Sequence, residues 1–567
     1  MADKIEIHYA SKSIACTAGV SVAAALTEAG ERIFRTTRKG AGRGVFCGMG
    51  VCQDCLVTID AVPNQRACMT IERDGMEVEP QSPAPVATAA NEKPLRQVEL
   101  TPDVLVIGGG PGGLAAAAVT AETGLDVVLA DERQKLGGQY YKQPIDAFVR
   151  EPEKLDRQFR KGRALIERSE RAGVRMLTGT SVWAVSGPEE IMAAGPDAAY
   201  TIRPKRLIVA TGAYERGVPM PGWTLPGFMT TGAAQTFLRS YQVAPGRRIL
   251  LSGNGPLNLQ VAVELLRKGC TVVALAELSA APGPGKAREL LQLAANAPDL
   301  ALDGVRYLAT MRRASVPIFH RHAVIRADGK SQVERATIAE IDMAGNPVAG
   351  TEKNFDVDTV CAGFGFLPSN EIARTIGCKH RFDEHRGHLV VERDDCGRSS
   401  MAEVWVVGDC GGLGGARTAQ AMGIAAGADC ARDLGKPARE RTTGEMARAA
   451  RTLKRNAQFQ DALWRIYRAP RIIDQFAALD TLICRCEEVP LAAVDDAVGR
   501  DIAHVGGIKR MTRAGMGRCQ GRYCASLMME IAARRSGQPI DEFSLFAPRI
   551  PFKPIPIAHI APASDAP

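Results

Sequence analysis

Eight of the 15 cysteines in this sequence fall into two groups whose spacing suits metal ligands. The first group has the pattern C-x4-C-x2-C with a fourth cysteine after twelve more residues: Cys47, Cys52, Cys55 and Cys68. Four thiolates at such a spacing hold two irons and two sulfides, whereas zinc favours paired C-x2-C knuckles. We therefore predict a [2Fe-2S] cluster at this group. A zinc site and buried free thiols are the alternatives.

The second group lies near the end of the sequence and combines C-x-C with C-x4-C, 32 residues later: Cys484, Cys486, Cys519 and Cys524. A cluster held by four thiolates carries net negative charge, which nearby cations stabilise. Basic residues such as Arg518 and Arg522 crowd this stretch. We predict a second [2Fe-2S] cluster, with a solvated basic face as the alternative. The group resembles the small helical domain of bacterioferritin-associated ferredoxin, although that family closes with C-x2-C.

Between the two groups lies a glycine motif that suits a nucleotide phosphate. The apolar run DVLVI at 103–107 leads into Gly108-x-Gly110-x-x-Gly113, and the next apolar run ends at Asp131. In a strand–turn–helix unit these glycines permit the turn, admit the pyrophosphate and let the helix pack on the strand, while the acidic residue binds ribose hydroxyls. We predict a dinucleotide site. A glycine-rich turn without a nucleotide is the alternative.

A second unit repeats this order of strand, glycines, helix, strand and acid, with Gly253-x-Gly255 and Glu277. Asn258 stands where the third glycine belongs and brings a side chain into a tight contact between helix and strand. The unit can fold as a scaffold with or without its ligand. Whether NAD(P) binds at Gly253 therefore stays open.

The composition is that of a globular protein of several domains. At 567 residues the chain is too long for one core, and about 150 residues per domain predicts about four domains. No apolar run approaches the ~18 residues that span a bilayer, and the N-terminus has no apolar core of a signal peptide, so we expect a cytoplasmic protein. The net charge of +8 is spread along the chain and only 5% of residues are aromatic, which does not indicate nucleic-acid binding.

The central motifs resemble the two-dinucleotide-domain flavoproteins of the glutathione reductase type. This resemblance rests on the fingerprint, on the Ala-Thr-Gly run at 210–212 and on VVGDC at 406–410. It implies that FAD binds here. The fingerprint and the resemblance together give these cofactor-binding residues: Gly108, Gly110, Pro111, Gly113, Asp131, Glu132, Gly138, Gln139, Ala210, Thr211, Gly212, Gly408 and Asp409. Residues 101–440 contain no C-x4-C or C-x2-C pair, which argues against a disulfide reductase.

Nearly the whole chain resembles the α subunits of opine oxidases, of hydrogen cyanide synthase and of heteromeric proline, hydroxyproline and sarcosine dehydrogenases. The runs that carry this resemblance are PGWTLPGFMTTGAAQ, ATGAYER, GDCGGLGGARTAQAMG, CRCEEV and TRAGMGRCQGRYC. It implies a smaller β subunit of the amino-acid-oxidase type, whose FAD oxidises the C–N bond of the substrate. Some members also carry FMN at the α–β junction. The ferredoxin-like module, a separate subunit in several systems, would here be fused in front.

The fold class that follows is α/β. It is a two-dinucleotide-binding-domain flavoprotein, glutathione-reductase-like, with an N-terminal β-grasp [2Fe-2S] domain and a C-terminal small helical [2Fe-2S] domain. The expected segments are 1–90, [2Fe-2S] domain and linker; 101–240, first part of the FAD-binding domain; 241–345, second nucleotide-binding domain; 346–440, second part of the FAD-binding domain; 441–475, helical connector; 476–545, rear [2Fe-2S] domain; and 546–567, proline-rich tail.

The sequence shows cofactor motifs but no nucleophile motif, Walker loop or paired carboxylates. The local histidine pairs 320/322 and 385/388 suit solvated residues better than metal ligands. We therefore predict an oxidoreductase of C–N bonds that works as the electron-transfer α subunit of a hetero-oligomeric amine, opine or imino-acid dehydrogenase. Electrons would pass from the β-subunit flavin through FAD or FMN and the clusters to a small-molecule acceptor or a respiratory chain. The alternatives are a self-contained NAD(P)H-dependent ferredoxin reductase and a non-enzymatic iron–sulfur carrier or sensor.

Overall fold

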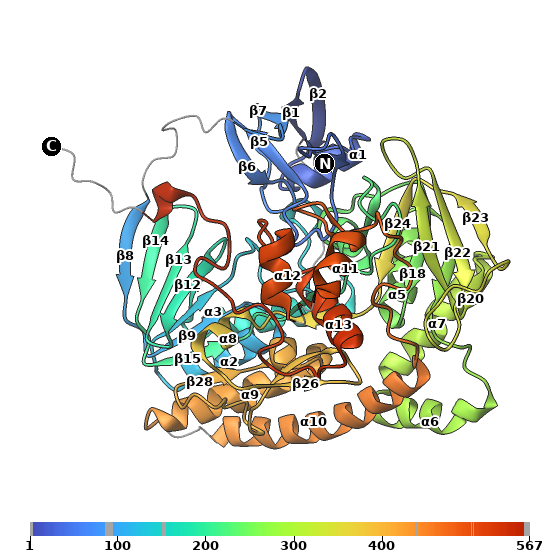
Figure 1. Ribbon diagram of the computed structural model, residues 1–567. Coiled ribbons are helices and arrows are strands. Elements are labelled where there is room, and N and C mark those ends of the chain that lie inside the picture. Colours follow the sequence, from blue (N-terminus) through green and yellow to red (C-terminus); the bar gives the residue numbers. More distant parts are fainter. Residues whose placement is uncertain are drawn as a thin grey trace.

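The computed structural model of the chain describes residues 4–85, 95–149, 155–436, 440–500, 502 and 504–560. Residues 86–94 of the expected linker and 561–567 of the expected tail lie outside the described residues. A front module (residues 4–85) sits on two neighbouring sheet-containing lobes, and a rear module (residues 476–545) lies across them (Figure 1). A long helix runs along the opposite side of both lobes from the front module.

The front module is a five-stranded sheet in the order β2-β1-β7-β5-β6 with one helix packed against it. Its elements are β1 (Lys4–Tyr9), β2 (Lys12–Thr17), α1 (Val22–Glu28), β3 (Arg35–Thr36), β4 (Gly42–Arg43), β5 (Leu56–Ile59), β6 (Val62–Arg66) and β7 (Met76–Pro80). Ser21 begins α1 by accepting a hydrogen bond from the Ala24 amide at 3.3 Å, a cap that stabilises a helix by about 1 kcal/mol. The loop between β4 and β5 carries three of the first four cysteines.

The first lobe is built on a parallel sheet in the order β11-β10-β9-β15-β28. Its elements are β9 (Val104–Ile107), α2 (Pro111–Ala121), β10 (Val127–Ala130), α3 (Arg157–Arg171), β11 (Arg175–Leu177), β15 (Arg206–Val209), β28 (Val404–Val406) and α9 (Gly415–Asp433). β9 and β10 are apolar and buried throughout, as strands covered on both faces must be. Gly423 lets α9 approach α2 closely, because a Cβ there would lie 2.1 Å from the Gly112 carbonyl oxygen.

A four-stranded sheet in the order β12-β13-β14-β8 shares a hydrophobic core with this parallel sheet. Its strands are β8 (Arg96–Leu100), β12 (Ser181–Gly187), β13 (Glu190–Ala194) and β14 (Ala198–Ile202). Phe552 from the expected tail is buried in the same core, and its amide donates to the Trp183 carbonyl at 3.1 Å. The described part of the tail therefore packs on its own chain.

The second lobe has a parallel sheet in the order β17-β24-β18-β19-β20 and an antiparallel sheet in the order β21-β22-β23. Its elements are β17 (Phe228–Thr230), α4 (Thr231–Thr236), β18 (Arg248–Gly253), α5 (Pro256–Arg267), β19 (Thr271–Glu277), α6 (Ala287–Asn296), α7 (Pro298–Arg313), β20 (Ile318–His320), β21 (His322–Asp328), β22 (Arg335–Glu340), β23 (Lys353–Asp356) and β24 (Thr359–Gly363). Strands β17 and β24 lie on either side of the expected 241–345 segment. They join this sheet because β24 pairs with both β17 and β18.

Smaller elements lie between the two lobes and the rear module. They are β16 (Ala213–Glu215), β25 (Phe366–Pro368), α8 (Glu371–Ile376), β26 (His380–Asp383) and β27 (His388–Val391). β16 pairs with β25 and β26 pairs with β27, in both cases antiparallel.

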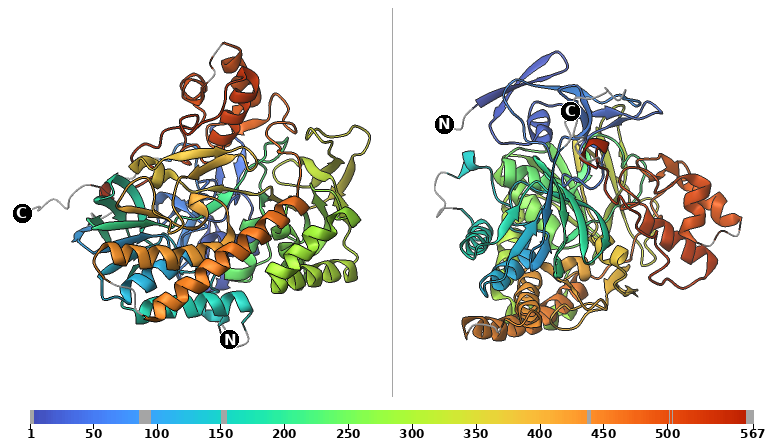
Figure 2. Two further views of the ribbon diagram at one scale, coloured as in Figure 1. Left: turned by 90° about the horizontal axis from the view of Figure 1, so that it is seen from below. Right: turned by 90° about the vertical axis from the view of Figure 1, so that its left-hand side faces the viewer.

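Helix α10 (Glu440–Ile466) spans both lobes and ends near the second one (Figures 1 and 2). Asn456 donates to Thr418 of α9 at 2.6 Å, while Arg455 donates to the Ala295 carbonyl of α6 at 3.2 Å. The rear module that follows contains β29 (Leu482–Cys484), β30 (Val489–Pro490), α11 (Leu491–Gly499), α12 (Val505–Thr512) and α13 (Ala525–Ser536).

The two parallel sheets and the five-stranded sheet of the front module confirm the predicted α/β fold class for the two central domains and the N-terminal domain. Among the described residues, no helix is both long and apolar enough to cross a membrane.

Candidate functional site

The first glycine motif forms the turn between β9 and α2. Gly108 has φ +108°, and a Cβ on Gly113 would lie 1.8 Å from the Gly108 carbonyl oxygen, so both positions require glycine. A Cβ on Gly110 would meet no protein atom closer than the Gly138 Cα at 3.9 Å. Pro111 occupies the first turn of α2, and no side chain caps this helix. The free N–H groups of α2 thus point into open space that suits a phosphate.

Acidic residues follow β10 beside this turn. The Asp131 carboxylate accepts hydrogen bonds from the Gly109 amide at 2.6 Å and the Arg133 amide at 2.7 Å. Burial raises the pKa of Asp131, and these two amides oppose that effect. Each carboxylate oxygen still has a lone pair for a ribose hydroxyl.

Glu132 has a different environment. Its carboxylate accepts a hydrogen bond from Lys553 of the tail at 2.7 Å and lies 3.8 Å from Arg66 of the front module. Burial alone would raise the pKa of Glu132, but the two cations lower it to about 2. Glu132 therefore holds three parts of the chain together, a role that its place after the strand does not predict.

The loop after β10 closes over the phosphate position. Gly138 has φ +63°, and a Cβ there would lie 2.8 Å from the Gly110 Cα. The Gln139 carbonyl accepts a hydrogen bond from Lys142 at 2.9 Å, and Lys142 also donates to Gln235 at 3.1 Å. Burial lowers the pKa of Lys142 to about 7. Sequence reasoning missed Lys142, although it lies only three residues beyond Gln139.

The two later motifs meet the same turn. The Ala210 carbonyl oxygen would be 2.4 Å from a Cβ on Gly108, and Thr211 donates to the Ser369 carbonyl at 2.6 Å. Gly212 follows with φ +71°. All three residues lie just after β15, at the same carboxyl edge of the sheet as the fingerprint.

Gly408 and Asp409 follow β28 at this edge. Gly408 has φ +73°, and Asp409 accepts hydrogen bonds from the amides of Gly414 and Gly415 at 2.8 and 2.9 Å. The Gly408-Asp409 pair is thus held near the start of α9. Strand β15 lies between β28, which precedes this pair, and β9, which precedes the fingerprint.

Glu215, in β16, is a second buried ionisable group that sequence reasoning missed. It accepts a hydrogen bond from the Gly232 amide at 2.8 Å, and its other carboxylate oxygen is buried without a hydrogen-bond partner. Burial raises the pKa of Glu215 to about 7. The sequence signal that could have revealed Glu215 is its position shortly after the Ala-Thr-Gly run.

The residues described so far fit a dinucleotide, because they combine an open helix N-terminus, glycines at close approaches and a carboxylate beside the turn. A cavity of about 360 Å³ extends from this site to the front module. Gly138 and Lys142 line it on one side, and Cys68 and Met69 line it on the other. The cavity therefore connects the nucleotide site with a candidate cluster ligand.

The first four cysteines are buried and lie in two pairs. The Cys47 thiol interacts with that of Cys52, and the Cys68 thiol interacts with that of Cys55. The Cys52 amide donates to the Cys47 sulfur at 3.3 Å. Burial raises the pKa of Cys47, but Cys52 and three backbone amides hold it below its usual value. Two thiol pairs fit two irons, each of which needs two protein ligands.

The second four cysteines are paired as well. The Cys486 sulfur lies 3.7 Å from that of Cys484 and 3.8 Å from that of Cys519. The Cys484 thiol is also hydrogen-bonded to Cys524, so the unusual C-x4-C ending brings both of its thiols to the group. Among the described residues, no three or more His, Cys, Asp and Glu side chains are arranged to hold one metal ion.

The histidine prediction needs one correction. His385 is exposed, but His388 is only 3% exposed, because β27 turns it into the interior. Its Nε2 atom is buried without a partner. A local sequence pair does not reveal which of its members faces solvent.

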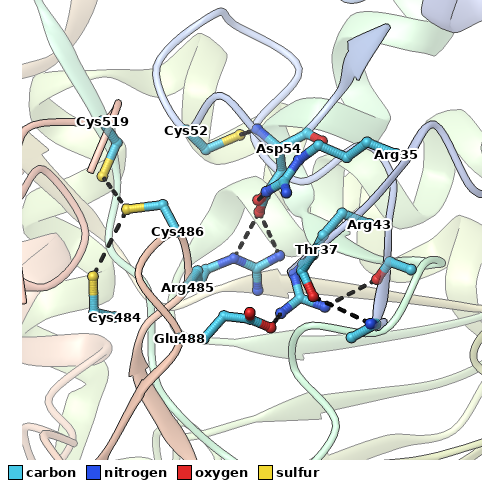
Figure 3. A network of polar contacts seen from close by, with 12 residues as sticks. Arg35, Thr37, Arg43, Cys52, Asp54, Cys484, Arg485, Cys486, Glu488 and Cys519 are labelled. Atoms are coloured by element: carbon cyan, nitrogen blue, oxygen red, sulfur yellow. Dashed lines mark hydrogen bonds and ion pairs between the residues drawn. The ribbon is translucent and has the colours of Figure 1, made fainter. Parts of the chain in front are cut away.

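A buried ionic bridge joins the two cysteine modules (Figure 3). The Asp54 carboxylate accepts a hydrogen bond from Arg485 at 2.9 Å and another from Arg35 at 2.8 Å. Arg485 stands between Cys484 and Cys486, and Asp54 stands between Cys52 and Cys55. Burial alone would raise the pKa of Asp54, but the surrounding guanidinium groups hold it below its usual value. The two candidate cluster sites are thus packed together.

Comparison with family models assigns most of the chain. Residues 102–423 match the pyridine nucleotide-disulphide oxidoreductase family, and residues 2–83 match a 2Fe-2S iron-sulfur cluster binding domain. Residues 478–564 match the sarcosine oxidase A3 domain, a match that includes most of the expected tail.

Curated relatives match along most of the chain. Hydrogen cyanide synthase subunit HcnB of Pseudomonas aeruginosa is 31% identical over 80% of this chain and 97% of its own length. An opine oxidase subunit of Rhizobium meliloti is 30% identical over 81% of this chain and 98% of its own length. The chain belongs to the pyridine nucleotide-disulphide oxidoreductases, in the family of HcnB and this opine oxidase subunit.

Two further comparisons concern the front module and the whole fold. Hydrogen cyanide synthase subunit HcnA of Pseudomonas aeruginosa is 45% identical over 76 residues, which cover 13% of this chain and 73% of that subunit. The crystal structure of L-proline dehydrogenase from P. horikoshii superposes with a TM-score of 0.70 at 21% identity, over 99% of this chain and 98% of that one. This likeness confirms the fold.

In this member of the HcnB family, the second glycine motif is partly covered. Asn254, between its two glycines, donates to the carbonyl of Tyr467 at 3.0 Å, just beyond the end of α10. Burial and the nearby Glu277 raise the pKa of Tyr467. Glu277 accepts hydrogen bonds from the amides of Gly255 and Ser279 at 3.1 and 2.9 Å.

Asn258 does more than replace a glycine. It donates to the Gly363 carbonyl at 2.9 Å and accepts from Thr231 at 2.8 Å. The side chain therefore joins α5 to β24 and α4 from inside the fold. The HcnB-family chain uses this position as a structural contact.

Proposed function

We propose that this chain is the electron-transfer subunit of a complex that oxidises the C–N bond of an amine, opine or imino acid. In this proposal a smaller partner subunit of the amino-acid-oxidase type binds the substrate with its own FAD. The observation that carries the proposal is the cavity between the predicted nucleotide site and Cys68, because a flavin at that site would lie within reach of a cluster at Cys68. The two curated relatives, by their names, are subunits of a hydrogen cyanide synthase and of an opine oxidase.

In the proposed assignment, FAD is held by the first glycine motif, Asp131, the loop at Gly138 and Gln139, the Ala-Thr-Gly run and the Gly408-Asp409 pair. FAD supplies two-electron chemistry, and [2Fe-2S] clusters at the two cysteine groups supply one-electron steps. The α2 N-terminus and its unbonded amides bind the pyrophosphate. Asp131 binds ribose hydroxyls.

Lys142 and Glu215 give this site groups that exchange protons near neutral pH, since each has a pKa of about 7. Both are buried, Lys142 at 4% exposure and Glu215 at 3%. We assign to Lys142, which lines the cavity, the holding and release of a proton there, with the Glu215 carboxylate as a neighbouring charged group. The polar contacts of Lys142 with Gln139 and Gln235 keep its ammonium group there.

The front module belongs to the same proposal. It corresponds to the separate subunit HcnA of hydrogen cyanide synthase and is here joined to the HcnB-like part in one chain. An FMN at the contact with the partner subunit, and a small-molecule acceptor or respiratory chain beyond the clusters, complete the proposal.

The alternative of an NAD(P)H-dependent reductase requires an open second nucleotide site. The Tyr467 carbonyl accepts a hydrogen bond from Asn254 in that motif, and the Asn258 side chain fills the helix–strand contact where the fingerprint has its third glycine. We therefore expect NADH and NADPH to leave the visible flavin absorption of the isolated chain unchanged. Rapid bleaching by either nucleotide would favour the reductase.

Purification from the native host tests the main proposal. The expected result is a co-purifying smaller chain, about two FAD (one in each subunit) and four irons per copy of this chain, and FMN in the flavin extract. Anaerobic addition of proline, sarcosine or an opine should then bleach the flavin and produce cluster EPR signals. A lone protein without flavin, or a complete complex that none of a broad panel of secondary amines reduces, contradicts the proposal.

A further inference from the structure

The loop that carries Cys519 and Cys524 inserts an aromatic side chain beside the front cysteines. Tyr523 is 3% exposed and packs in one hydrophobic cluster with Cys47, Cys52 and Phe46. Its ring centroid lies 5.2 Å from that of Phe46, at an interplanar angle of 67°. A residue of the rear module therefore forms part of the surroundings of the front cysteine group.

The Tyr523 ring lies in a pocket whose walls are themselves held in place by contacts with the rear module. Arg485 stacks on Phe46 at 3.8 Å and on Trp223 at 4.7 Å, and the Trp223 indole N–H donates to the Leu482 carbonyl at 2.9 Å. Gly217 closes the pocket, since a Cβ there would lie 3.3 Å from the Tyr523 ring. Figure 3 shows the Arg485 guanidinium group pointing toward Asp54, which lies next to Cys52 of the front group.

The Tyr523 hydroxyl is buried and has no hydrogen-bond partner in the protein. A buried hydroxyl without a partner costs about 1–3 kcal/mol, so such groups usually meet a ligand, a water or a cofactor. Cys47 and Cys52 belong to the same buried cluster as Tyr523, so a sulfur atom at the front cysteine group is an acceptor available to this hydroxyl.

We propose that the Tyr523 hydroxyl donates a hydrogen bond to a sulfur atom of the front [2Fe-2S] cluster and raises the reduction potential of that cluster. The inference rests on the proposed function, because it requires a cluster at Cys47, Cys52, Cys55 and Cys68. A hydrogen bond to sulfur stabilises the more negative, reduced cluster, which is one of the ways by which a protein sets its potential.

This assignment also gives the two clusters a direct connection. Tyr523 precedes Cys524 in the chain, so its main chain belongs to a rear ligand loop while its hydroxyl reaches the front cluster. Docking of the rear module would thus be needed for the full potential of the front cluster.

The test is the reduction potential of each cluster in the purified full-length chain, followed by EPR during a redox titration. Cys55→Ser identifies the front signal, since it changes one ligand of that cluster alone. In Tyr523→Phe we expect the equilibrium constant for reduction of the front cluster to fall about tenfold. For one electron this lowers the reduction potential of the front cluster by about 59 mV, and the potential of the rear cluster should not change. An unchanged front potential in a Tyr523→Phe protein that keeps both clusters overturns the inference.

Tyr9→Phe is the matched control. It removes a hydroxyl from the front module itself, where Tyr9 donates to the Ile33 carbonyl at 2.6 Å and lies outside the cluster around Phe46. We expect no shift of the front potential in this variant. An equal shift in both variants would show a general loss of packing and would overturn the specific role of Tyr523.

A second measurement uses the unmodified protein and does not depend on folding of a variant. Proton ENDOR of the reduced front cluster should show an exchangeable coupling that disappears in D2O and is absent in Tyr523→Phe. A wild-type spectrum without an exchangeable coupling overturns the inference. Wild-type protein that holds no front cluster contradicts the proposed function instead, which separates the two failures.

Discussion

At the scale of single residues, two fingerprint glycines have different tasks although both belong to one motif. Gly113 is needed by the fold, because a Cβ there would overlap the Gly108 carbonyl. Gly110 has φ −81°, and a Cβ there would meet only protein atoms at 3.9 Å or beyond. The fold itself does not require glycine there, which agrees with the proposal that a ligand approaches this backbone.

Replacing Gly110 with alanine should leave the folded protein intact and abolish FAD binding. The added methyl group occupies the space in which the pyrophosphate approaches α2. Flavin content and thermal melting of the purified variant measure the two effects. Gly113→Ala should instead reduce soluble protein, and Gly304→Ala, in open space on α7, should change neither. Full FAD content in Gly110→Ala would contradict the assignment of this site.

Replacing Cys55 with alanine should remove the front cluster and about half of the iron, since two of about four irons belong to each [2Fe-2S] site. Chemical iron determination and EPR measure the loss. Cys16→Ala is a suitable control, because Cys16 is buried in β2 of the same module but belongs to neither group. Equal iron loss in both variants would mean that the front module merely unfolds.

At the scale of elements, hairpins and helices decide which polar groups are buried. The β26–β27 hairpin buries His380 and His388, and burial lowers the pKa of each to about 4. An unfolded histidine has a pKa near ~6.5. As the pH falls from about 6.5 to about 4, the unfolded chain takes up protons that the folded chain does not, so stability is lost in this window.

His388→Gln should therefore reduce the fall of the melting temperature between pH 7 and pH 4.5. The replacement does not titrate, so the contribution of this site to the pH dependence disappears. Differential scanning calorimetry at a series of pH values provides the measurement. His385→Gln, at an exposed position, should retain the wild-type slope. A slope in His388→Gln identical to that of the wild type would refute the prediction.

At the scale of the whole molecule, ionic contacts between distant segments hold the modules in place. Asp54 and Arg485 are 1% and 6% exposed, and Arg43 of the front module pairs with Glu488 of the rear module at 3.2 Å. On the other side of the front module, Glu132 connects Arg66 with Lys553. Together these contacts join the front module to the rear module, the tail and the first lobe.

Asp54→Asn should destabilise the protein by roughly 3–5 kcal/mol, because it leaves buried guanidinium groups without their anion. Chemical denaturation and limited proteolysis of the boundary between front module and lobes should both report the change. Glu31→Gln breaks an exposed pair with Lys12 and should cost about 1 kcal/mol or less. Equal stability of the two variants would contradict the importance of the bridge.

The sequence by itself determined the parts of this protein that depend on local spacing. The cysteine patterns, the strand–glycine–helix fingerprint and the family runs each lie within short stretches, and ligand geometry or turn geometry requires those residue types there. Even so, Glu132, predicted as a cofactor residue, has its carboxylate paired with Lys553 and Arg66, because the tail and the front module fold back onto the first lobe.

Only the tertiary structure decided the contacts between segments that are far apart in the chain. Tyr523 packs in one cluster with Cys47 and Cys52, and the Tyr467 carbonyl accepts a hydrogen bond from Asn254 of the second glycine motif; no periodicity in the sequence predicts either arrangement. Burial also set the pKa values of Lys142 and Glu215, since desolvation depends on all neighbours at once. Local chemistry thus predicts the cofactor sites, whereas long-range packing decides which of the predicted residues lie together.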